Sequence, residues 1–229
     1  MHKSLWLPGT LLILSGMLYA EEPSNARIEN TFSNQAFLQD LARNSRLYGR
    51  INDQPHWAPE RCDNAPSLPI KHMSKSNDDA SHGHKLYSIF AKDSPQYLLT
   101  GKEKASTKPV QVEPVARLPG DDNCLQVLVK ESWIPELAQD RNQRGEDNLL
   151  PLAHKGKWYR ASKPAGLFIM MQFDSKTPDT DAGWVYATIA ADGKTVTSSG
   201  LVKNCMECHR AAPHGRVFGL SRDKPESDQ

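Results

Sequence analysis

The chain has 229 residues, and its 28 Lys and Arg residues against 27 Asp and Glu residues leave a formal net charge of +1. A chain of this length can bury the core of one ordinary domain. Its balanced charge gives no sign of a nucleic-acid-binding protein, so we expect no nucleic-acid partner.

The first twenty residues are typical of a secretory signal peptide. His2 and Lys3 give a short positive start, residues 5–19 are largely apolar, and Ala20 offers a small residue for cleavage. The apolar run is too short and too weakly flanked for a stable transmembrane anchor. We therefore expect residues 1–20 to be removed and the protein to be periplasmic, without a stable membrane anchor.

Two helices are expected before the middle of the chain. Between Ile28 and Tyr48, apolar residues recur at steps of about three and four, as on one face of a helix. A second amphipathic helix is predicted from the spacing of Leu86, Ile89 and Phe90.

Beyond about residue 109 the apolar period changes to two, which indicates strands. Residues 125–133 alternate in the manner of a strand with one buried face. Residues 166–173 form a continuous apolar run, which is consistent with a strand covered on both faces.

A hairpin is expected near the C-terminal end of these strands. Residues 184–189 and 195–198 read as strands, and Asp192-Gly193 between them favours a type I′ turn. Residues 140–148 are charged and contain a glycine, so we expect a solvated insertion there.

The strongest motif is Cys205-Met206-Glu207-Cys208-His209, a C-x-x-C-H sequence. This spacing is typical of c-type haem attachment, in which the two thiols bond the porphyrin and the histidine binds the iron. A zinc site would need a second ligand pair, and a thioredoxin-like motif would be expected in a βαβ pattern. We therefore expect one covalently attached haem c held by Cys205, Cys208 and His209.

The other two cysteines are Cys62 and Cys124. In an oxidising compartment an isolated pair usually forms a disulfide. The alternative is two unpaired buried thiols.

The order of elements is helix, helix, several antiparallel strands and a short haem-binding helix from about Val202. This order predicts an α+β fold dominated by an antiparallel sheet, with flanking N-terminal helices. It does not fit a helical mono-haem cytochrome.

Five segments between Lys85 and Leu220 together resemble the cytochrome P-460 family, which also includes cytochrome c prime beta. They are Leu86–Asp93, Val127–Trp133, Ala165–Met171, Gly183–Thr197 and Cys205–Leu220. The resemblance implies a small β-rich, often dimeric protein with one pentacoordinate haem c on a proximal histidine. It also implies chemistry on small nitrogen species: hydroxylamine oxidation in the P-460 branch and nitric oxide binding in the c prime beta branch.

With this resemblance the chain divides into four parts. Residues 1–20 are the signal peptide, 21–84 a helical and loop extension, 85–220 the cytochrome P-460-like haem domain, and 221–229 a polar tail.

In cytochrome P-460 a lysine is covalently joined to a haem meso carbon, and the matching position here is Lys130. Alternation places its side chain on the same strand face as Leu128 and Ser132. A lysine desolvated against a porphyrin would be partly neutral and hence nucleophilic. The alternative is an ordinary lysine whose ammonium reaches solvent. Glu131 should point to the opposite face and is therefore not assigned a catalytic role.

Several further residues have two interpretations. Met170 and Met171 are either iron ligands or core residues. Phe90, Phe168 and Phe173 either close the distal pocket or pack in the core. Arg216 pairs with a haem propionate or is solvated.

Three functions remain open. The first is a haem-dependent oxidoreductase that oxidises hydroxylamine or a related small nitrogen compound and passes electrons to a soluble partner. The second is a nitric oxide-binding protein without turnover. The third is an electron-transfer cytochrome with a sixth protein ligand on the iron.

Overall fold

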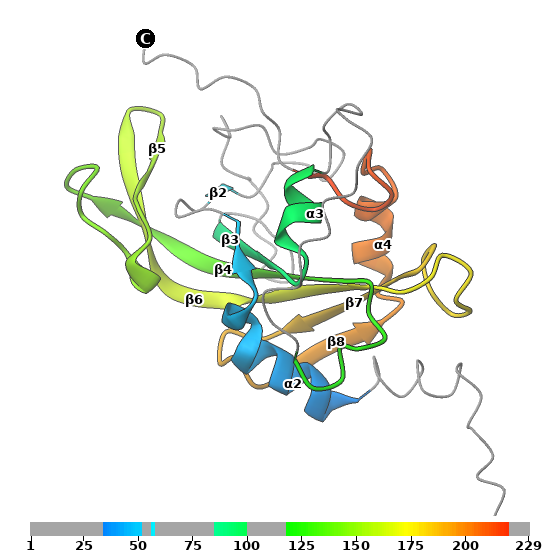
Figure 1. Cartoon of the computed structure of the whole chain (residues 1–229). Helices are drawn as coiled ribbons and strands as arrows, with labels where there is room; N and C mark the ends of the chain where they lie inside the picture. Colours follow the sequence, from blue (N-terminus) through cyan, green and yellow to red (C-terminus); the bar gives the residue numbers. More distant parts are fainter. Residues whose placement is uncertain (1–33, 52–55, 58–84, 100–117, 220–229) are drawn as a thin grey trace, which may run out of the picture.

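The computed structural model describes residues 34–51, 56–57, 85–99 and 118–219, and Figure 1 shows their arrangement. These residues form one sheet in which β1, β3, β4, β6, β7 and β8 are neighbours in that order, while β2 pairs with β3 and β5 with β6. Every pairing is antiparallel. With a few short helices, this sheet confirms the expected α+β class at a broad level.

The elements have the following bounds. The strands are β1 (Gly49–Arg50), β2 (His56–Trp57), β3 (Leu86–Ala91), β4 (Gln126–Ala138), β5 (Leu152–His154), β6 (Lys157–Gln172), β7 (Trp184–Ile189) and β8 (Val196–Gly200). The helices are α2 (Gln35–Asn44), α3 (Ser94–Leu99) and α4 (Lys203–His209), with 3₁₀ turns η1 (Ser45–Leu47) and η2 (Glu146–Asn148).

The predicted second amphipathic helix is wrong, because residues 86–91 form strand β3. The apolar residues at helical spacing misled the prediction because five of the six strand residues are buried, which removes the polar alternation of a one-sided strand. Tyr, Ile and Phe also favour strands. The helix begins only at Ser94 and forms α3.

The first predicted helix is confirmed over part of its length. Asn34 caps α2 by accepting a hydrogen bond from the Phe37 backbone N–H at 3.2 Å. Residues 28–33 of the prediction lie outside the described residues, as does the signal peptide at residues 1–20. Among the described elements, no helix is both long and apolar enough to cross a membrane.

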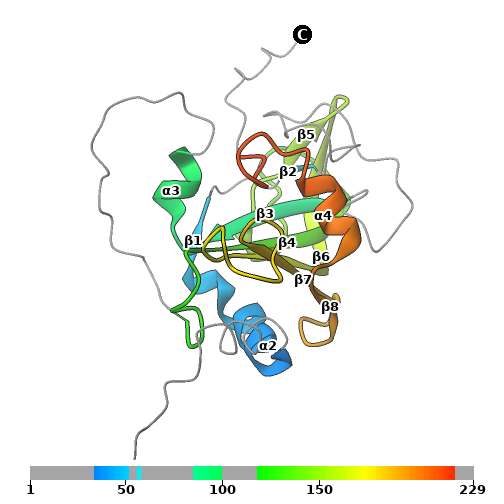
Figure 2. The same ribbon diagram turned by 90° about the vertical axis from the view of Figure 1, so that its right-hand side faces the viewer.

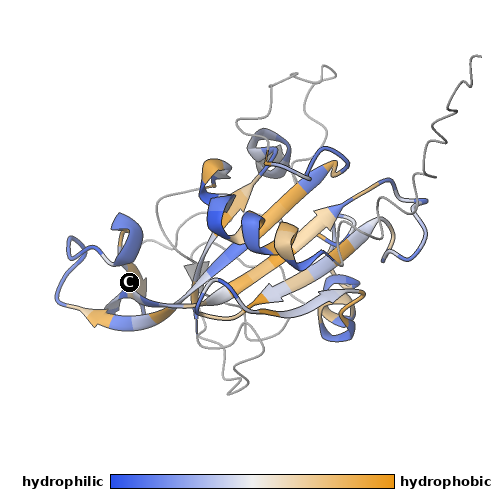
Figure 3. Cartoon of the chain, turned by 90° about the horizontal axis from the view of Figure 1, so that it is seen from below, coloured by the Kyte–Doolittle hydropathy of each residue, from blue (hydrophilic) through white to orange (hydrophobic). Residues whose placement is uncertain are grey.

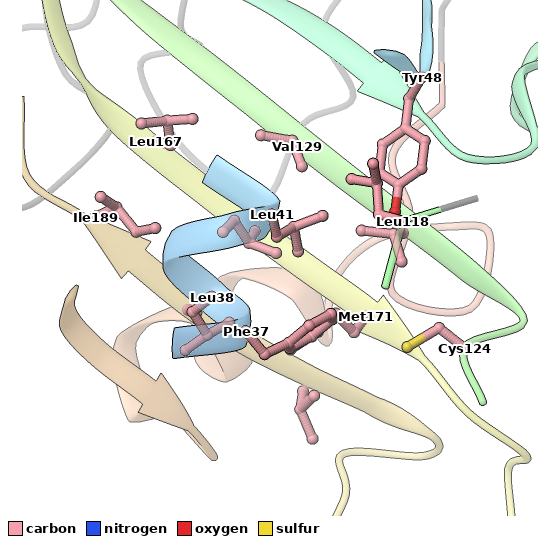
Figure 4. Close-up of a cluster of buried hydrophobic side chains, with 14 of the residues drawn as sticks. Phe37, Leu38, Leu41, Tyr48, Leu118, Cys124, Val129, Leu167, Met171 and Ile189 are labelled. Atoms are coloured by element: carbon pink, nitrogen blue, oxygen red, sulfur yellow. The ribbon is translucent and has the colours of Figure 1, made fainter. Parts of the chain in front are cut away.

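One face of the sheet packs against α2, and this contact forms the largest core cluster (Figure 4). Leu38 and Leu41 of α2 are fully buried against Val129, Leu167 and Ile189 of the sheet. Burying a leucine side chain contributes about 1.5–3 kcal/mol. In Figure 3 the middle of the sheet is mostly apolar and the loops around it are mostly hydrophilic. This is the face that α2 seals.

The opposite face carries α4, since Figures 1 and 2 place α2 and α4 on opposite sides of the sheet. Leu128, Met170 and Tyr186 are buried on this side, with Cys205 and Met206 of α4 packed against them. Because successive strand residues point to opposite faces, β4 supplies alternate residues to the core and to this second side.

Strands β4 and β6 extend beyond their neighbours as a long hairpin that also carries β5 (Figure 1). The expected insertion at residues 140–148 lies at this end and is mostly exposed. It is tied back by Asp147, whose carboxylate lies 3.1 Å from the Arg46 guanidinium and 2.9 Å from that of Arg50.

The hairpin of β7 and β8 is confirmed, but its predicted type I′ turn is wrong. A type I′ turn requires positive φ at both central residues, and of Asp192 and Gly193 only the glycine has one, at +67°. Instead, the Ala190 N–H donates to the Thr195 carbonyl at 2.9 Å, so residues 191–194 form a longer loop. The Asp192 carboxylate stabilises this loop by accepting hydrogen bonds from the backbone N–H groups of Lys194 and Thr195.

Candidate functional site

Helix α4 brings the C-x-x-C-H motif onto the sheet beside a cavity. Cys205 and His209 are four residues apart, so they lie on the same face of the helix, and both line the cavity. Cys208 is also half-buried on α4.

The cavity encloses about 830 Å³ of empty space, which includes space open to solvent. The described residues that line it are Tyr87, Ile89, Tyr97, Leu128, Lys130, Phe168, Ile169, Met170, Tyr186, Ala187, Cys205, His209, Val217, Phe218 and Gly219. Its walls are therefore mainly apolar and aromatic, with a thiol, an imidazole and one ammonium. Such a lining fits the flat apolar body of a porphyrin and supplies an attachment point and an iron ligand.

The ring of His209 is held with a defined proton position. Its Nδ1 lies 2.7 Å from the backbone carbonyl oxygen of Arg216. Because a carbonyl oxygen only accepts, Nδ1 must carry the proton, which leaves Nε2 with the lone pair that a metal needs. Burial lowers the pKa of His209, with the Arg216 carbonyl acting in the opposite direction. The net shift favours the neutral ring, which is the ligating form.

Aromatic rings flank the histidine. The centroids of the Tyr186 and Phe218 rings each lie 5.5 Å from that of His209. These contacts restrict the rotation of the imidazole in addition to its hydrogen bond.

Behind the histidine, Asp181 collects several hydrogen bonds. The Arg216 guanidinium donates to both carboxylate oxygens at 2.9 Å, and the Tyr186 hydroxyl donates at 3.0 Å. Burial raises the pKa of Asp181, but the bonds from Arg216 and Tyr186 outweigh it and lower the pKa below its usual value. Asp181 therefore stays ionised. No motif in the sequence indicated this contact, because Asp181 and Arg216 are 35 residues apart.

Lys130 lines the cavity together with Leu128, on the strand face that the two residues were predicted to share. Its Nζ lies 3.9 Å from the centroid of the Tyr87 ring, at cation–π distance. Glu131 points to the other side of the sheet, where its carboxylate accepts a bond from Arg46 at 2.7 Å. The opposite orientation of these two residues is confirmed, while the bond from Lys130 to a haem stays a prediction.

The structure shows which of the candidate methionines and phenylalanines line the cavity and which lie in the core. Met170 and Phe168 line the cavity. Met171, Phe90 and Phe173 are buried in the core beneath α2. The hypothesis that Phe90 and Phe173 close the pocket is therefore wrong, because both point to the opposite face of the sheet.

Arg216 reaches the site through its backbone carbonyl and its contact with Asp181. Its pairing with a haem propionate stays a prediction.

Cys124 is a buried free thiol beneath α2, and no disulfide occurs among the described residues. Burial raises its pKa to about 12. The expected partner Cys62 lies outside the described residues, so the bridge stays a prediction.

The zinc alternative gains no support from the side chains near the motif. Among the described residues, no three His, Cys, Asp or Glu side chains cluster in a way that could hold a metal ion.

Comparison of the chain with models of protein families, with curated proteins and with solved structures gives no match, so a functional assignment depends on the residues of this cavity.

Proposed function

We propose that the chain is a periplasmic mono-haem c-type cytochrome of the P-460 type that oxidises hydroxylamine or a related small nitrogen compound. The observation that supports this function best is that Cys205, His209 and Lys130 line one apolar cavity. These are the residue types expected for porphyrin attachment, iron ligation and a lysine bond to the haem edge, and they come from two distant parts of the sequence.

A bound haem c would supply an iron with one open position, which can coordinate a small nitrogen compound and accept its electrons. Cys205 and Cys208 would hold the porphyrin, and His209 would present Nε2 to the metal. The apolar walls, such as Ile89 and Leu128, would exclude water from the reacting face.

Lys130 would tune this site. The Tyr87 ring holds its amine inside the cavity instead of at the surface. An amine bonded to the porphyrin edge would distort the ring and change its electronic structure, which is one way in which a protein alters iron reactivity.

A second candidate, nitric oxide binding without turnover, is favoured by the lack of a carboxylate among the described lining residues. Oxidation of hydroxylamine releases protons and therefore needs an acceptor near the iron. Burial raises the pKa values of Tyr87 and Tyr97, so these phenols stay protonated at neutral pH and do not serve as the proton acceptor. A ligand that needs no proton acceptor suits such a lining.

The decisive experiment is to express the chain in a host competent for cytochrome c maturation and to purify the coloured protein. Intact mass tests for haem attachment, and Cys205→Ala with Cys208→Ala is the matched control that should lose the covalent haem. Colourless wild-type protein with both thiols free would contradict the whole proposal.

Spectra and turnover then separate the candidates. A strongly red-displaced Soret band of the ferrous protein, together with hydroxylamine turnover using an artificial acceptor, supports the enzyme. An ordinary high-spin haem c without turnover supports nitric oxide binding. A six-coordinate low-spin spectrum would instead indicate an electron-transfer cytochrome, with Met170 as the first residue to test as the sixth ligand.

A further inference from the structure

We infer that Asp181, Tyr186 and Arg216 form a positioning unit, here called the Asp181 clamp, which sets the orientation and ligand strength of His209. The clamp acts through the histidine, the proposed iron ligand, and its Tyr186 also lines the cavity beside Cys205. This inference rests on the proposed haem site and adds residues to it that the C-x-x-C-H motif does not contain.

The centre of the clamp is a buried carboxylate on a rigid turn. Asp181 is 6% exposed. Its backbone N–H donates to the Trp184 carbonyl at 2.8 Å and its own carbonyl accepts from the Trp184 N–H at 3.2 Å. Ala182 and Gly183 between them both have positive φ, at +54° and +89°. The turn therefore fixes where the carboxylate stands relative to β7.

The carboxylate holds Arg216 in a bidentate pair. The guanidinium Nε donates to Oδ2 and Nη2 donates to Oδ1, both at 2.9 Å. Such fork-like pairs are directional and stronger than neutral hydrogen bonds. Arg210 adds a looser ion pair, with its Nε 3.6 Å from Oδ1.

The backbone of Arg216 is strained in a way that the clamp explains. Its φ is +77°, next to Gly215 at +58°, and the turn is closed by reciprocal bonds between His214 and Val217 at 3.1 and 3.3 Å. A residue other than glycine rarely adopts this conformation and keeps it only where the surrounding structure enforces it. The pair with Asp181 supplies that constraint. The Arg216 carbonyl consequently faces Nδ1 of His209 at 2.7 Å.

Tyr186 connects the same carboxylate to the imidazole by a second route. Its hydroxyl donates to Asp181 at 3.0 Å while its ring lies 5.5 Å from the His209 ring. The Asp181 carboxylate therefore fixes both the Arg216 carbonyl, which accepts the hydrogen bond from Nδ1 of His209, and the Tyr186 ring, which flanks the imidazole. Partners of this kind set the tautomer and raise the basicity of a ligating histidine.

A more basic histidine binds the iron more strongly and favours its ferric state. Loosening the clamp should therefore lower the iron–histidine stretching frequency and raise the reduction potential. These two quantities report on the histidine bond itself, so a general loss of stability does not move them.

The test uses haem-loaded Asp181→Asn and Tyr186→Phe. The matched control is Asp121→Asn, because Asp121 is also a buried carboxylate held by a tyrosine hydroxyl, with Tyr48 at 2.6 Å, and by a cation, with Lys92 at 3.2 Å. Tyr48 and its neighbours lie in the core beneath α2, on the other face of the sheet. Resonance Raman spectra of the ferrous proteins, redox titration and thermal unfolding are measured for all.

Both clamp variants should shift the stretch down and the potential up, while Asp121→Asn lowers the unfolding temperature with both haem quantities unchanged. If Asp181→Asn does not fold, Tyr186→Phe carries the test, because it removes one hydroxyl and keeps the ring. Unchanged stretch and potential in a folded clamp variant would overturn the inference while leaving the haem proposal intact. Wild-type protein without covalent haem would overturn both.

Discussion

Replacing Leu41 by alanine should destabilise the protein strongly without changing the proposed site. Leu41 is fully buried where α2 meets the sheet (Figure 4). Truncation of such a leucine leaves a cavity and costs about 2–5 kcal/mol. For a chain of this size each kcal/mol lowers the melting temperature by about 2–4 °C. A cost of about 3 kcal/mol, within the range for such truncations, therefore predicts a decrease of about 6–12 °C.

The assay is thermal unfolding of the purified protein followed by circular dichroism, together with the Soret spectrum of the haem-loaded form. Leu47→Ala is the matched control, because Leu47 follows α2 closely and is 60% exposed. Its effect should stay within about 0.5 kcal/mol. A Leu41→Ala protein as stable as this control would refute the packing of α2 on the sheet. A displaced Soret band in Leu41→Ala would refute the separation of the core from the site.

Three further predictions concern single residues. Lys130→Met should keep the covalent haem and give an intact mass equal to apoprotein plus unmodified haem; a wild-type mass with the same difference would exclude the lysine bond. Burial raises the pKa of Glu131 in the folded protein, so the fold favours the protonated carboxyl. The contribution of this group to the free energy of unfolding is therefore complete below its unfolded pKa of about 4.3 and is lost as the pH rises through its pKa in the folded protein. Urea unfolding should therefore show Glu131→Gln gaining stability relative to wild type as the pH rises from about 4 to about 7, and a pH-independent difference would contradict this. Gly183→Ala should cost about 1–3 kcal/mol because the residue has positive φ and a Cβ would lie 2.9 Å from a backbone oxygen; Gly193→Ala, with open space around it, is the control and should cost less.

The elements that the sequence predicted correctly are those whose pattern is local. Strand β7 has the predicted bounds, 184–189. The alternation in β4 correctly assigned Lys130 and Glu131 to opposite faces, because the period of a strand is two whatever surrounds it. Helix α4 begins just after Val202, as expected. In these cases the structure of the element follows from residues that are close together in the sequence.

The features that could not be predicted depend on contacts between distant residues. Strand β3 is covered on both faces, so only its partners β1, β2 and β4 distinguish it from a buried helix. The pair of Asp181 and Arg216 joins the turn before β7 to the turn after α4, and no local pattern relates two residues that are 35 positions apart. The predicted turn at Asp192-Gly193 was wrong because the register of the hairpin, and not the dipeptide, sets the length of its loop.

The alternation along β4 has a consequence for how this protein can vary. Neighbouring positions of the strand serve unrelated purposes, since Val129 packs under α2 and Lys130 enters the cavity. Inserting or deleting one amino acid here would turn every subsequent side chain to the opposite face of the sheet, so that a carboxylate would enter the cavity and an ammonium would enter the apolar core. This segment can therefore change by replacement but not by a change of length, and any redesign of the cavity must preserve the number of residues in the strand.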